Sequence, residues 1–147
     1  MKISTKARYG LRSLLDLALH DKGTPIGVKE IAKRQRVSEK YLEQLLLHLK
    51  KAGYVRSIHG AKGGYHLAKD PAAIPLRGVV EALEGSLSLV DCVLNPGVCP
   101  ESKSCVSREL WCRIAGAIGK ELDGLTLKQM IEWQEEKKGD GLGMYDI

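Results

Sequence analysis

The chain has 147 residues, of which 44% are hydrophobic, 28% charged and 5% aromatic, and it contains no phenylalanine. This composition favours one folded domain and excludes a disordered or fibrous chain. Residues 1–69 carry 15 Lys and Arg against 5 Asp and Glu, whereas residues 70–147 carry 8 against 13. The basic half favours a polyanionic partner, and a solvated lysine-rich surface is the alternative explanation of the same charges.

The sequence predicts a cytoplasmic chain without membrane contact. No apolar run approaches the roughly 18 residues that a membrane span needs, and the first residues lack the apolar stretch of a signal peptide. Thiols stay reduced in the cytoplasm. The four cysteines therefore suggest a metal or redox site before a disulfide framework.

The spacing of apolar residues in the first third of the chain predicts three helices. The first begins after Ser4, which is a capping residue type, and ends near His20. The second covers residues 28–35. Ser38 caps the third helix, because its hydroxyl can accept a hydrogen bond from a first-turn amide that has no helical partner. Gly53 is placed to end this third helix.

A β-hairpin is predicted after the third helix. Residues 54–58 and 65–68 are its strands, and the six residues between them include three glycines, which permit a tight turn. Further along, a fourth helix is predicted over residues 76–84, and residues 86–104 are expected to be a loop.

Two helices are predicted in the C-terminal part of the chain. A long one runs from about residue 105 to residue 122, and Thr126 and Gln129 form a capping box that opens the last one. The long helix carries one apolar stripe, and Gly116 and Gly119 within it suggest a close helix approach of the kind a dimer seam uses. Internal packing against the N-terminal part is the alternative. The stripe consists of Leu110, Ile114, Ala117, Ile118 and Leu122.

Two short helices with a tight connection, followed by a glycine-turned hairpin, indicate a winged helix-turn-helix whose third helix enters the major groove. In that helix Gln44 can pair with adenine, Tyr41 can reach a phosphate, and Lys40 supplies backbone charge. Glu43 would act as a discriminator, because a carboxylate accepts only from a donor such as cytosine N4. An ordinary helical hairpin with a solvated basic face is the alternative.

The hairpin tip supplies the remaining candidate DNA contacts. Gly60 and Gly63 let it fold tightly, so that Lys62 projects toward a phosphate or a minor groove with His59 beside it. A surface histidine at a strand end is the alternative role for His59.

Four cysteines form the one group with ligand-like chemistry: Cys92, Cys99, Cys105 and Cys112. Thiolates favour iron–sulfur clusters, zinc or copper. A structural zinc site is disfavoured because no two cysteines are separated by only two to four residues. Cys105 opens a helix, whose dipole lowers a thiol pKa and stabilises a negatively charged cluster. Cys112 lies about 10 Å further along this helix and is expected to be buried at a helix interface.

Three segments of the chain resemble the IscR-like family of winged helix-turn-helix iron–sulfur cluster regulators, which includes NsrR-like and CymR-like members. They are residues 4–10 (STKARYG), 41–45 (YLEQL) and 60–65 (GAKGGY), and the likeness spans about residues 1–135. It implies a homodimer held by the long C-terminal helix, in which Ser38, Tyr41 and Gln44 read or position DNA and the wing enters a minor groove. His59 stands where the family usually carries an arginine.

The resemblance also implies an iron–sulfur cluster on Cys92, Cys99 and Cys105, favouring 2Fe–2S with 4Fe–4S as the alternative. CymR-like members lack this triad. The fourth ligand stays open, because Arg108 stands where IscR-like chains have a histidine, and Arg8 where some NsrR-like chains have an aspartate. An arginine cannot ligate iron. Glu109 or an exogenous group are the alternatives.

The sequence therefore predicts a mainly α fold with a small β-hairpin and the function of a dimeric transcription regulator. Its iron–sulfur cluster would sense cluster supply, redox state or nitric oxide while two DNA-binding heads bind a palindromic operator. A clusterless thiol-switched regulator and a zinc or redox thiol protein are the alternatives. An enzyme is not expected, since the chain has no C-x-x-C pair, no Ser/His/Asp set and no phosphate loop, and its four histidines occupy surface-like positions.

The expected units are a winged helix-turn-helix DNA-binding domain at 1–85, a cysteine-bearing cluster loop at 86–104, dimerisation helices at 105–138 and a mobile tail at 139–147.

Overall fold

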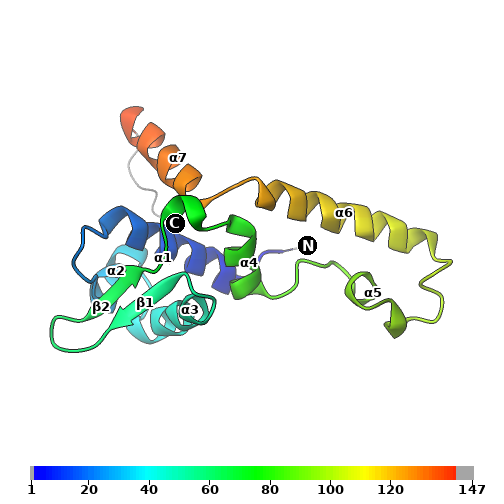
Figure 1. Cartoon of the computed structure of the whole chain (residues 1–147), viewed down its shortest axis with the longest axis horizontal. Coiled ribbons are helices and arrows are strands. Elements are labelled where there is room, and N and C mark those ends of the chain that lie inside the picture. The colour runs from blue at the N-terminus through cyan, green and yellow to red at the C-terminus, as the bar shows by residue number, and fades with distance from the viewer. Residues whose placement is uncertain (1, 142–147) are drawn as a thin grey trace.

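A computed structural model describes residues 2–141 of the chain (Figure 1). It confirms the predicted fold class, which is mainly α with one two-stranded antiparallel hairpin and a long C-terminal helix. Within the described residues, no helix is long and apolar enough to cross a membrane. The elements in chain order are α1 (Thr5–His20), α2 (Val28–Gln35), α3 (Glu39–Lys51), β1 (Val55–Ile58), β2 (Gly64–Leu67), η1 (Pro71–Ala73), α4 (Leu76–Glu84), α5 (Asp91–Leu94), η2 (Pro96–Val98), α6 (Val106–Asp123) and α7 (Leu127–Gly139).

Side-chain caps set the predicted helix starts. Ser4 Oγ accepts a hydrogen bond from the Ala7 amide at 3.1 Å and begins α1. Ser38 Oγ accepts from the Tyr41 amide at 3.1 Å and begins α3. Each cap satisfies an amide that the helix itself leaves without a partner, so the start is encoded locally. The capping box of Thr126 and Gln129 opens α7 in the same way.

The turn between α2 and α3 is tight because Arg36 adopts the left-handed conformation, with φ of 57°. It is the one non-glycine residue with positive φ in the described part of the chain. The Val37 amide then donates to the Ala32 carbonyl at 3.1 Å, which closes the end of α2. A left-handed residue reverses the chain in few residues, so the N-cap of α3, Ser38, lies only two positions later.

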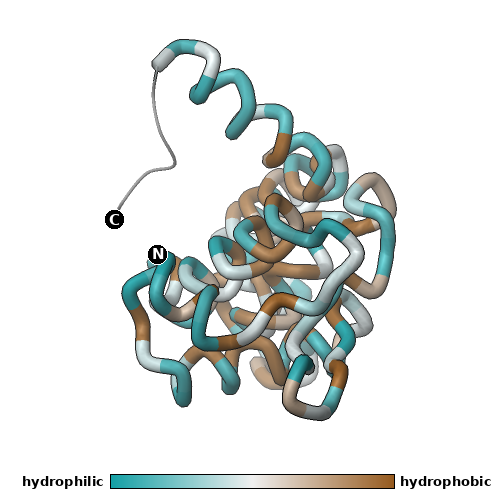
Figure 2. Tube along the Cα trace, turned by 90° about the vertical axis from the view of Figure 1, so that its left-hand side faces the viewer, coloured by the Kyte–Doolittle hydropathy of each residue, from teal (hydrophilic) through white to brown (hydrophobic). Residues whose placement is uncertain are grey.

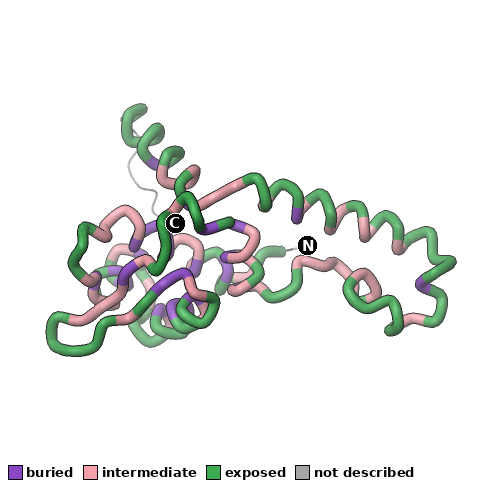
Figure 3. Tube along the Cα trace, viewed as in Figure 1, coloured by how far each residue is buried: buried purple, intermediate pink, exposed green. Residues whose placement is uncertain are grey.

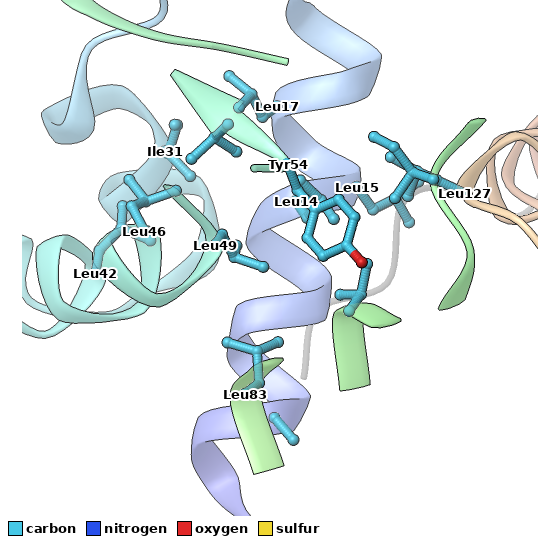
Figure 4. Close-up of a cluster of buried hydrophobic side chains, with 14 of the residues drawn as sticks. Leu14, Leu15, Leu17, Ile31, Leu42, Leu46, Leu49, Tyr54, Leu83 and Leu127 are labelled. Atoms are coloured by element: carbon cyan, nitrogen blue, oxygen red, sulfur yellow. The ribbon is translucent and has the colours of Figure 1, made fainter. Parts of the chain in front are cut away.

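The hydrophobic core lies around α1, in the compact N-terminal part of the chain that we call the head (residues 2–85). Buried side chains of α2, α3 and α4 converge on Leu14 and Leu17 of α1 (Figure 4). The hairpin side adds Tyr54 and Val55. Apolar positions accordingly gather in the middle of the head, with hydrophilic positions around them (Figure 2). Helix α7 packs on α1 and η1, and its first residue, Leu127, is fully buried in this core.

A carboxylate is buried beside this core. Asp16 of α1 has no exposed surface, and it accepts hydrogen bonds from Arg34 Nε at 3.0 Å and from Arg34 Nη2 at 2.7 Å. Gln35 Nε2 donates to the same carboxylate at 2.8 Å. The hydrogen bond to Asp16 is also the main reason why the pKa of Arg34 is raised. A buried charge is tolerated only when it is paired and hydrogen-bonded, so this network joins α1 firmly to α2.

Helix α6 extends away from the head and is mostly exposed or half-buried (Figures 1 and 3). It is joined to the head by Arg77 of α4, whose Nη1 donates to Asp123 Oδ2 at 2.8 Å. A Cβ atom at Gly119 would lie only 3.0 Å from Arg77 Nη1, whereas the space beside Gly116 is open. At Gly119 the structure therefore shows packing against the head, the alternative to a helix–helix seam.

Two short elements in the expected loop 86–104 escaped the sequence analysis. They are α5 and η2, and η2 starts where the Asn95 side chain accepts a hydrogen bond from the Gly97 amide at 3.2 Å. Elements of three or four residues are too short to show an apolar period, which explains why the pattern missed them. Most of the predicted tail, residues 142–147, lies outside the described residues.

Replacing Asp16 with alanine is expected to lower the free energy of unfolding by about 3 kcal/mol, because it leaves the Arg34 guanidinium and the Gln35 amide without their hydrogen-bond acceptor. We place the effect at the low end of the range for a broken buried pair, since the Arg34 side chain is 30% exposed. Urea unfolding at one fixed protein concentration measures it. Glu30→Ala is the matched control, because Glu30 contacts Arg34 at 3.9 Å but is 65% exposed. Its cost is expected below about 1 kcal/mol, and equal losses for both variants would contradict the role of the Asp16 network.

Candidate DNA interface and cysteine segment

Helix α3 presents one buried and one exposed face. Leu42, Leu45, Leu46 and Leu49 are buried in the head. The opposite side leaves Lys40, Glu43 and Gln44 exposed, and Ser38 is exposed at the N-cap. Tyr41 is half-buried, because the ring of Tyr9 from α1 packs against it. The predicted α3 residues therefore share a solvent-facing surface at the N-terminal half of the helix, where free amides and side chains can meet an anion.

The hairpin tip, which we call the wing (residues 59–63), is exposed at His59, Gly60 and Lys62. Gly60 adopts φ of 112°, a conformation that L side chains rarely adopt. A Cβ atom at Gly63 would collide with the Ile58 carbonyl oxygen. Both glycines are thus required by the turn itself, and the turn carries Lys62 and His59 outward.

The hairpin that carries the wing is anchored to the end of α1, where the Asp21 carboxylate contacts strand β2. This carboxylate accepts a hydrogen bond from the Leu67 amide at 3.0 Å, and it contacts His66 Nδ1 at 3.1 Å. Burial opposes ionisation of Asp21, but the hydrogen bonds from Leu67, His66 and Gly23 outweigh it and lower its pKa. The expectation that all four histidines lie at the surface is wrong for His66, which is buried. Its burial depends on a carboxylate 45 positions earlier in the chain.

A groove of about 480 Å³ lies between α3 and the wing. It brings together predicted residues from both segments, namely Glu43 of α3 and His59, Gly60 and Gly63 of the wing. Ser57 and Tyr65 also line this groove and were not predicted to do so; they face each other in the hairpin register. Side chains alternate between the two faces of a strand, and this alternation could have placed both residues on the same face of the hairpin.

Charge and hydrogen bonding link the two sides of this groove. Burial raises the pKa of Tyr65, and the negative charge of Glu43 across the groove raises it further. Lys50 Nζ donates to Ser57 Oγ at 2.7 Å, which joins α3 to β1. The wing and α3 are therefore one connected surface.

The three cysteines predicted to bind a cluster lie on consecutive short elements, which we call the cysteine segment (residues 91–105). Cys92 is in α5, Cys99 follows η2 and Cys105 is the N-cap of α6. Cys92 and Cys99 are half-buried and Cys105 is exposed. Among residues 2–141, no three His, Cys, Asp or Glu side chains are close enough together to hold a metal ion. The donor set suits an iron–sulfur cluster chemically, but the thiols are not already gathered into a site.

The two candidate positions on α6 for a fourth ligand are occupied by other contacts. Arg108 Nε donates to the Cys92 carbonyl at 3.0 Å and so joins α5 to α6. Glu109 accepts from Arg113 Nη2 at 3.3 Å in an exposed ion pair. The Arg108 side chain therefore holds the backbone of the cysteine segment in place. It can do so although an arginine cannot ligate metal.

The Cys105 thiol lies at the N-terminal end of α6, which favours its thiolate form. Its pKa is lowered, first by the Arg108 backbone amide and next by the Ser107 hydroxyl. This agrees with the predicted effect of a helix N-terminus on a thiolate. Cys112 is half-buried instead of buried, and it lines a cavity of about 470 Å³ between α4, α5 and α6.

A further apolar surface follows α6. Val106 is 84% exposed and Leu110 is 51% exposed. A groove of about 560 Å³ runs between α1, α4 and α6, with an almost wholly apolar lining that includes Leu11, Val80 and Ile118. Exposed apolar residues and apolar grooves of this kind are typical of a protein–protein contact.

Comparison with known proteins agrees with this architecture. Residues 3–133 match Rrf2, described as an iron-dependent transcriptional regulator. Protein rrf2 of Nitratidesulfovibrio vulgaris is 43% identical over 131 residues, which cover 89% of this chain and 87% of that protein. Among solved structures, CymR, the global cysteine regulator of B. subtilis, is 41% identical with a TM-score of 0.73, covering 90% of this chain and 98% of that one. T. potens IscR is 37% identical with a TM-score of 0.75, covering 100% and 94%.

The match extends over the head, the cysteine segment, α6 and the first half of α7. Two further relatives, CymR of Bacillus subtilis and IscR of Yersinia pseudotuberculosis, are named as HTH-type transcriptional regulators and not as enzymes. The overall fold is that of the solved CymR and IscR structures. The chain belongs to the Rrf2 family of transcriptional regulators.

Proposed function

We propose that the chain binds palindromic duplex DNA as a homodimer through α3 and the wing, acting in the cytoplasm as a repressor or activator. We further propose that an iron–sulfur cluster on Cys92, Cys99 and Cys105 sets its affinity or specificity. The observation that carries the DNA part is the joined surface of α3 and the wing, within the half of the chain that holds 15 basic and 5 acidic residues. A basic surface around an exposed helix face suits the major groove and its phosphates.

The residues of this surface divide into those that contact the backbone and those that contact bases. Lys40 and Lys62 are exposed cations for phosphates. Gln44 offers a bidentate amide to adenine, and Glu43 rejects base edges that lack a donor. Tyr41 contacts a phosphate from the first turn of α3. Ser38, Gly60 and Gly63 set the backbone positions of the helix start and the wing tip, and His59 lies at that tip. The imidazole of His59 is shorter than an arginine side chain and would therefore reach less deeply into a minor groove.

The dimer is supported by the apolar surfaces that one copy leaves open. We assign the exposed apolar face of α6 and the groove lined by Leu11, Val80 and Ile118 to contacts with a second copy. The chain would then consist of four units: the winged DNA-binding head at 1–85, the cluster loop at 86–104, the dimerisation helices at 105–138 and the tail at 139–147. Two heads on a twofold axis bind two half-sites, as palindromic operators require.

The cluster proposal is supported by the donor chemistry and by Cys105. Three cysteines on one segment offer soft thiolate ligands, and the lowered pKa of Cys105 favours the ligating form. When bound, such a cluster, 2Fe–2S or 4Fe–4S, supplies iron that reacts with oxygen or nitric oxide. The protein would transmit the response through contacts between its helices. Arg108 joins α5 to α6, and Arg77 joins α6 to α4 of the head. An altered cysteine segment can therefore shift the spacing of the two heads.

A thiol-switched regulator without a cluster is the second candidate. The observation that favours it is the exposed Cys105 thiol with its lowered pKa, since the thiolate is the form that oxidants attack. The 41% identity to the cysteine regulator CymR is consistent with this candidate.

Gln44→Ala is expected to weaken DNA binding by about 1–3 kcal/mol and to relax base preference at one position of each half-site. The probe is the duplex that the wild-type chain enriches from a random-sequence library, and fluorescence anisotropy at several salt concentrations gives the Kd. Lys40→Ala is the contrasting control, since loss of a phosphate contact weakens all duplexes alike and reduces the salt slope by about one. Equal weakening of every duplex by Gln44→Ala would make Gln44 a backbone contact. A salt-independent wild-type Kd would contradict DNA binding by the basic half.

Glu43→Ala is expected to broaden the set of duplexes bound, because it removes repulsion from base edges that offer no donor. Library selection with the variant, sequenced against the wild-type selection, measures this directly. Glu39→Ala is the matched control, since Glu39 is also an exposed acid of α3 but does not line the groove with the wing. Identical sequence preferences for wild type and Glu43→Ala would show that the carboxylate only faces water.

Alanine at Cys92, Cys99 or Cys105 is expected to abolish the visible absorption of anaerobically purified protein, because a missing thiolate opens the iron to solvent. Cys112→Ala is the matched control and should keep the spectrum, since Cys112 lies two helical turns beyond Cys105. Iron and sulfide analysis accompanies each spectrum. Loss of colour in Cys112→Ala alone would make Cys112 the fourth ligand. A wild-type chain without iron or sulfide would exclude the cluster, and an oxidant-dependent Kd that Cys105→Ala abolishes would then support the thiol switch.

A further inference from the structure

Two of the segments that carry the family resemblance, residues 4–10 and residues 41–45, contact each other. Tyr9 of the first packs against Tyr41 of the second. The rings of Tyr9 and Tyr41 lie 6.4 Å apart between centroids at 77°, an edge-to-face pair. The Tyr9 ring has a second contact, because the Arg12 guanidinium carbon lies 5.1 Å from its centroid. We call Arg12, Tyr9 and Tyr41 the aromatic ladder. It runs from α1 to the first turn of the helix that we assign to the major groove.

The α1 end of the ladder is held firmly. Glu84 of α4 accepts a hydrogen bond from the Ser4 amide at 3.0 Å, which ties the start of α1 to the head. Ser13 Oγ donates to the Tyr9 carbonyl at 2.7 Å. With the buried stripe of α1 below it, the Tyr9 backbone is fixed relative to the core. Tyr9 is therefore a rigid support for whatever packs against its ring.

The placement of Arg12 is unusual enough to need a reason. Its Nη1 atom is buried and makes no hydrogen bond to any described residue. A buried cationic donor without a partner is costly, and the negative face of an aromatic ring is the compensation that Tyr9 supplies. The guanidinium over the ring in turn restricts the rotation of the Tyr9 side chain.

Tyr41 occupies the third position of α3, where its orientation matters for DNA. Its amide is already satisfied by Ser38 Oγ at 3.1 Å, so the backbone of the first turn is set. The side chain is half-buried, and the freedom that remains is the rotation of its ring and hydroxyl. Edge-to-face packing on Tyr9 limits this rotation before any DNA arrives.

We propose that Tyr9, backed by Arg12, is a positioning residue for DNA recognition: it preorganises Tyr41 to contact a phosphate. This rests on the proposed function, because it takes Tyr41 as a DNA contact. Tyr9 itself touches no DNA in this scheme. A side chain that is ordered in the free protein loses less entropy on binding, so the ladder improves affinity without adding a contact.

A double-mutant cycle tests this coupling. The Kd for the duplex selected by the wild-type chain is measured for wild type, Tyr9→Leu, Tyr41→Leu and the double variant. Tyr9→Leu is expected to weaken binding about two- to tenfold, the range of one aromatic pair. In the Tyr41→Leu background the same change should have no further effect, because a positioning residue acts only through the group it positions.

Tyr9→Phe is the matched control, since it keeps the ring and its edge-to-face contact, and its Kd should stay within twofold of wild type. A Tyr9→Leu chain that binds like wild type would overturn the inference, as would a Tyr9→Leu effect that persists undiminished without Tyr41. If Tyr9→Leu fails to fold by circular dichroism, Arg12→Met replaces it in the same cycle. That variant keeps both rings and removes the cation, and it must again lose its effect when Tyr41 is absent.

The outcomes also separate this inference from the function on which it rests. A wild-type chain that selects no duplex would contradict both the proposed DNA binding and the positioning role of Tyr9. A wild-type chain that binds a duplex while Tyr41→Leu binds it equally well would leave DNA binding intact and reject the ladder as a positioning device.

Discussion

The buried carboxylate of Asp16 is the constraint on which the head depends. It lies on α1, the helix that contacts α2, α3, α4, α7 and β2, and it binds α2 through the Arg34 fork and the Gln35 amide. Since α2 leads into α3 through the left-handed turn at Arg36, the direction of α3 is set relative to α1 by a charged network and not by apolar contact alone. Apolar packing tolerates small rotations, whereas a paired buried charge does not, because each lost hydrogen bond leaves a costly unsatisfied group.

The joint between α4 and α6 gives the molecule its second constraint. Arg77 reaches Glu81 on its own helix and Asp123 on α6, and its guanidinium packs where Gly119 has no side chain. The backbones meet nearby, where the Leu76 amide donates to the Leu125 carbonyl at 3.0 Å. These contacts fix the C-terminal end of α6 on the head. The other end carries Cys105 and, through Arg108, the short helix with Cys92, so both ends of α6 are connected to parts with proposed function.

The cysteine segment differs in kind from the head. Its elements have three or four residues, and neither α5 nor η2 contains a buried residue. Segments with few buried contacts are the parts of a protein that open and rearrange most readily. On the proposal that these thiols bind a cluster, they can gather around it or separate from it at small cost to the fold. The head keeps its structure through its own core, so a signal can be received in one region and used in another.

The sequence by itself determined the helices, the hairpin and their caps, because each depends on neighbours within a few residues. Residues 28–35 and 76–84 were predicted as helices and are α2 and α4, and Ser4, Ser38 and Thr126 begin helices as their side-chain chemistry dictates. The exposed face of α3 followed from its apolar stripe. Contacts between distant residues were decided only by the tertiary structure. His66 is buried against Asp21, Gly119 accommodates Arg77, and Tyr9 supports Tyr41, each from another element. No local pattern encodes these pairs, because burial and charge pairing are set by which surfaces the fold brings together.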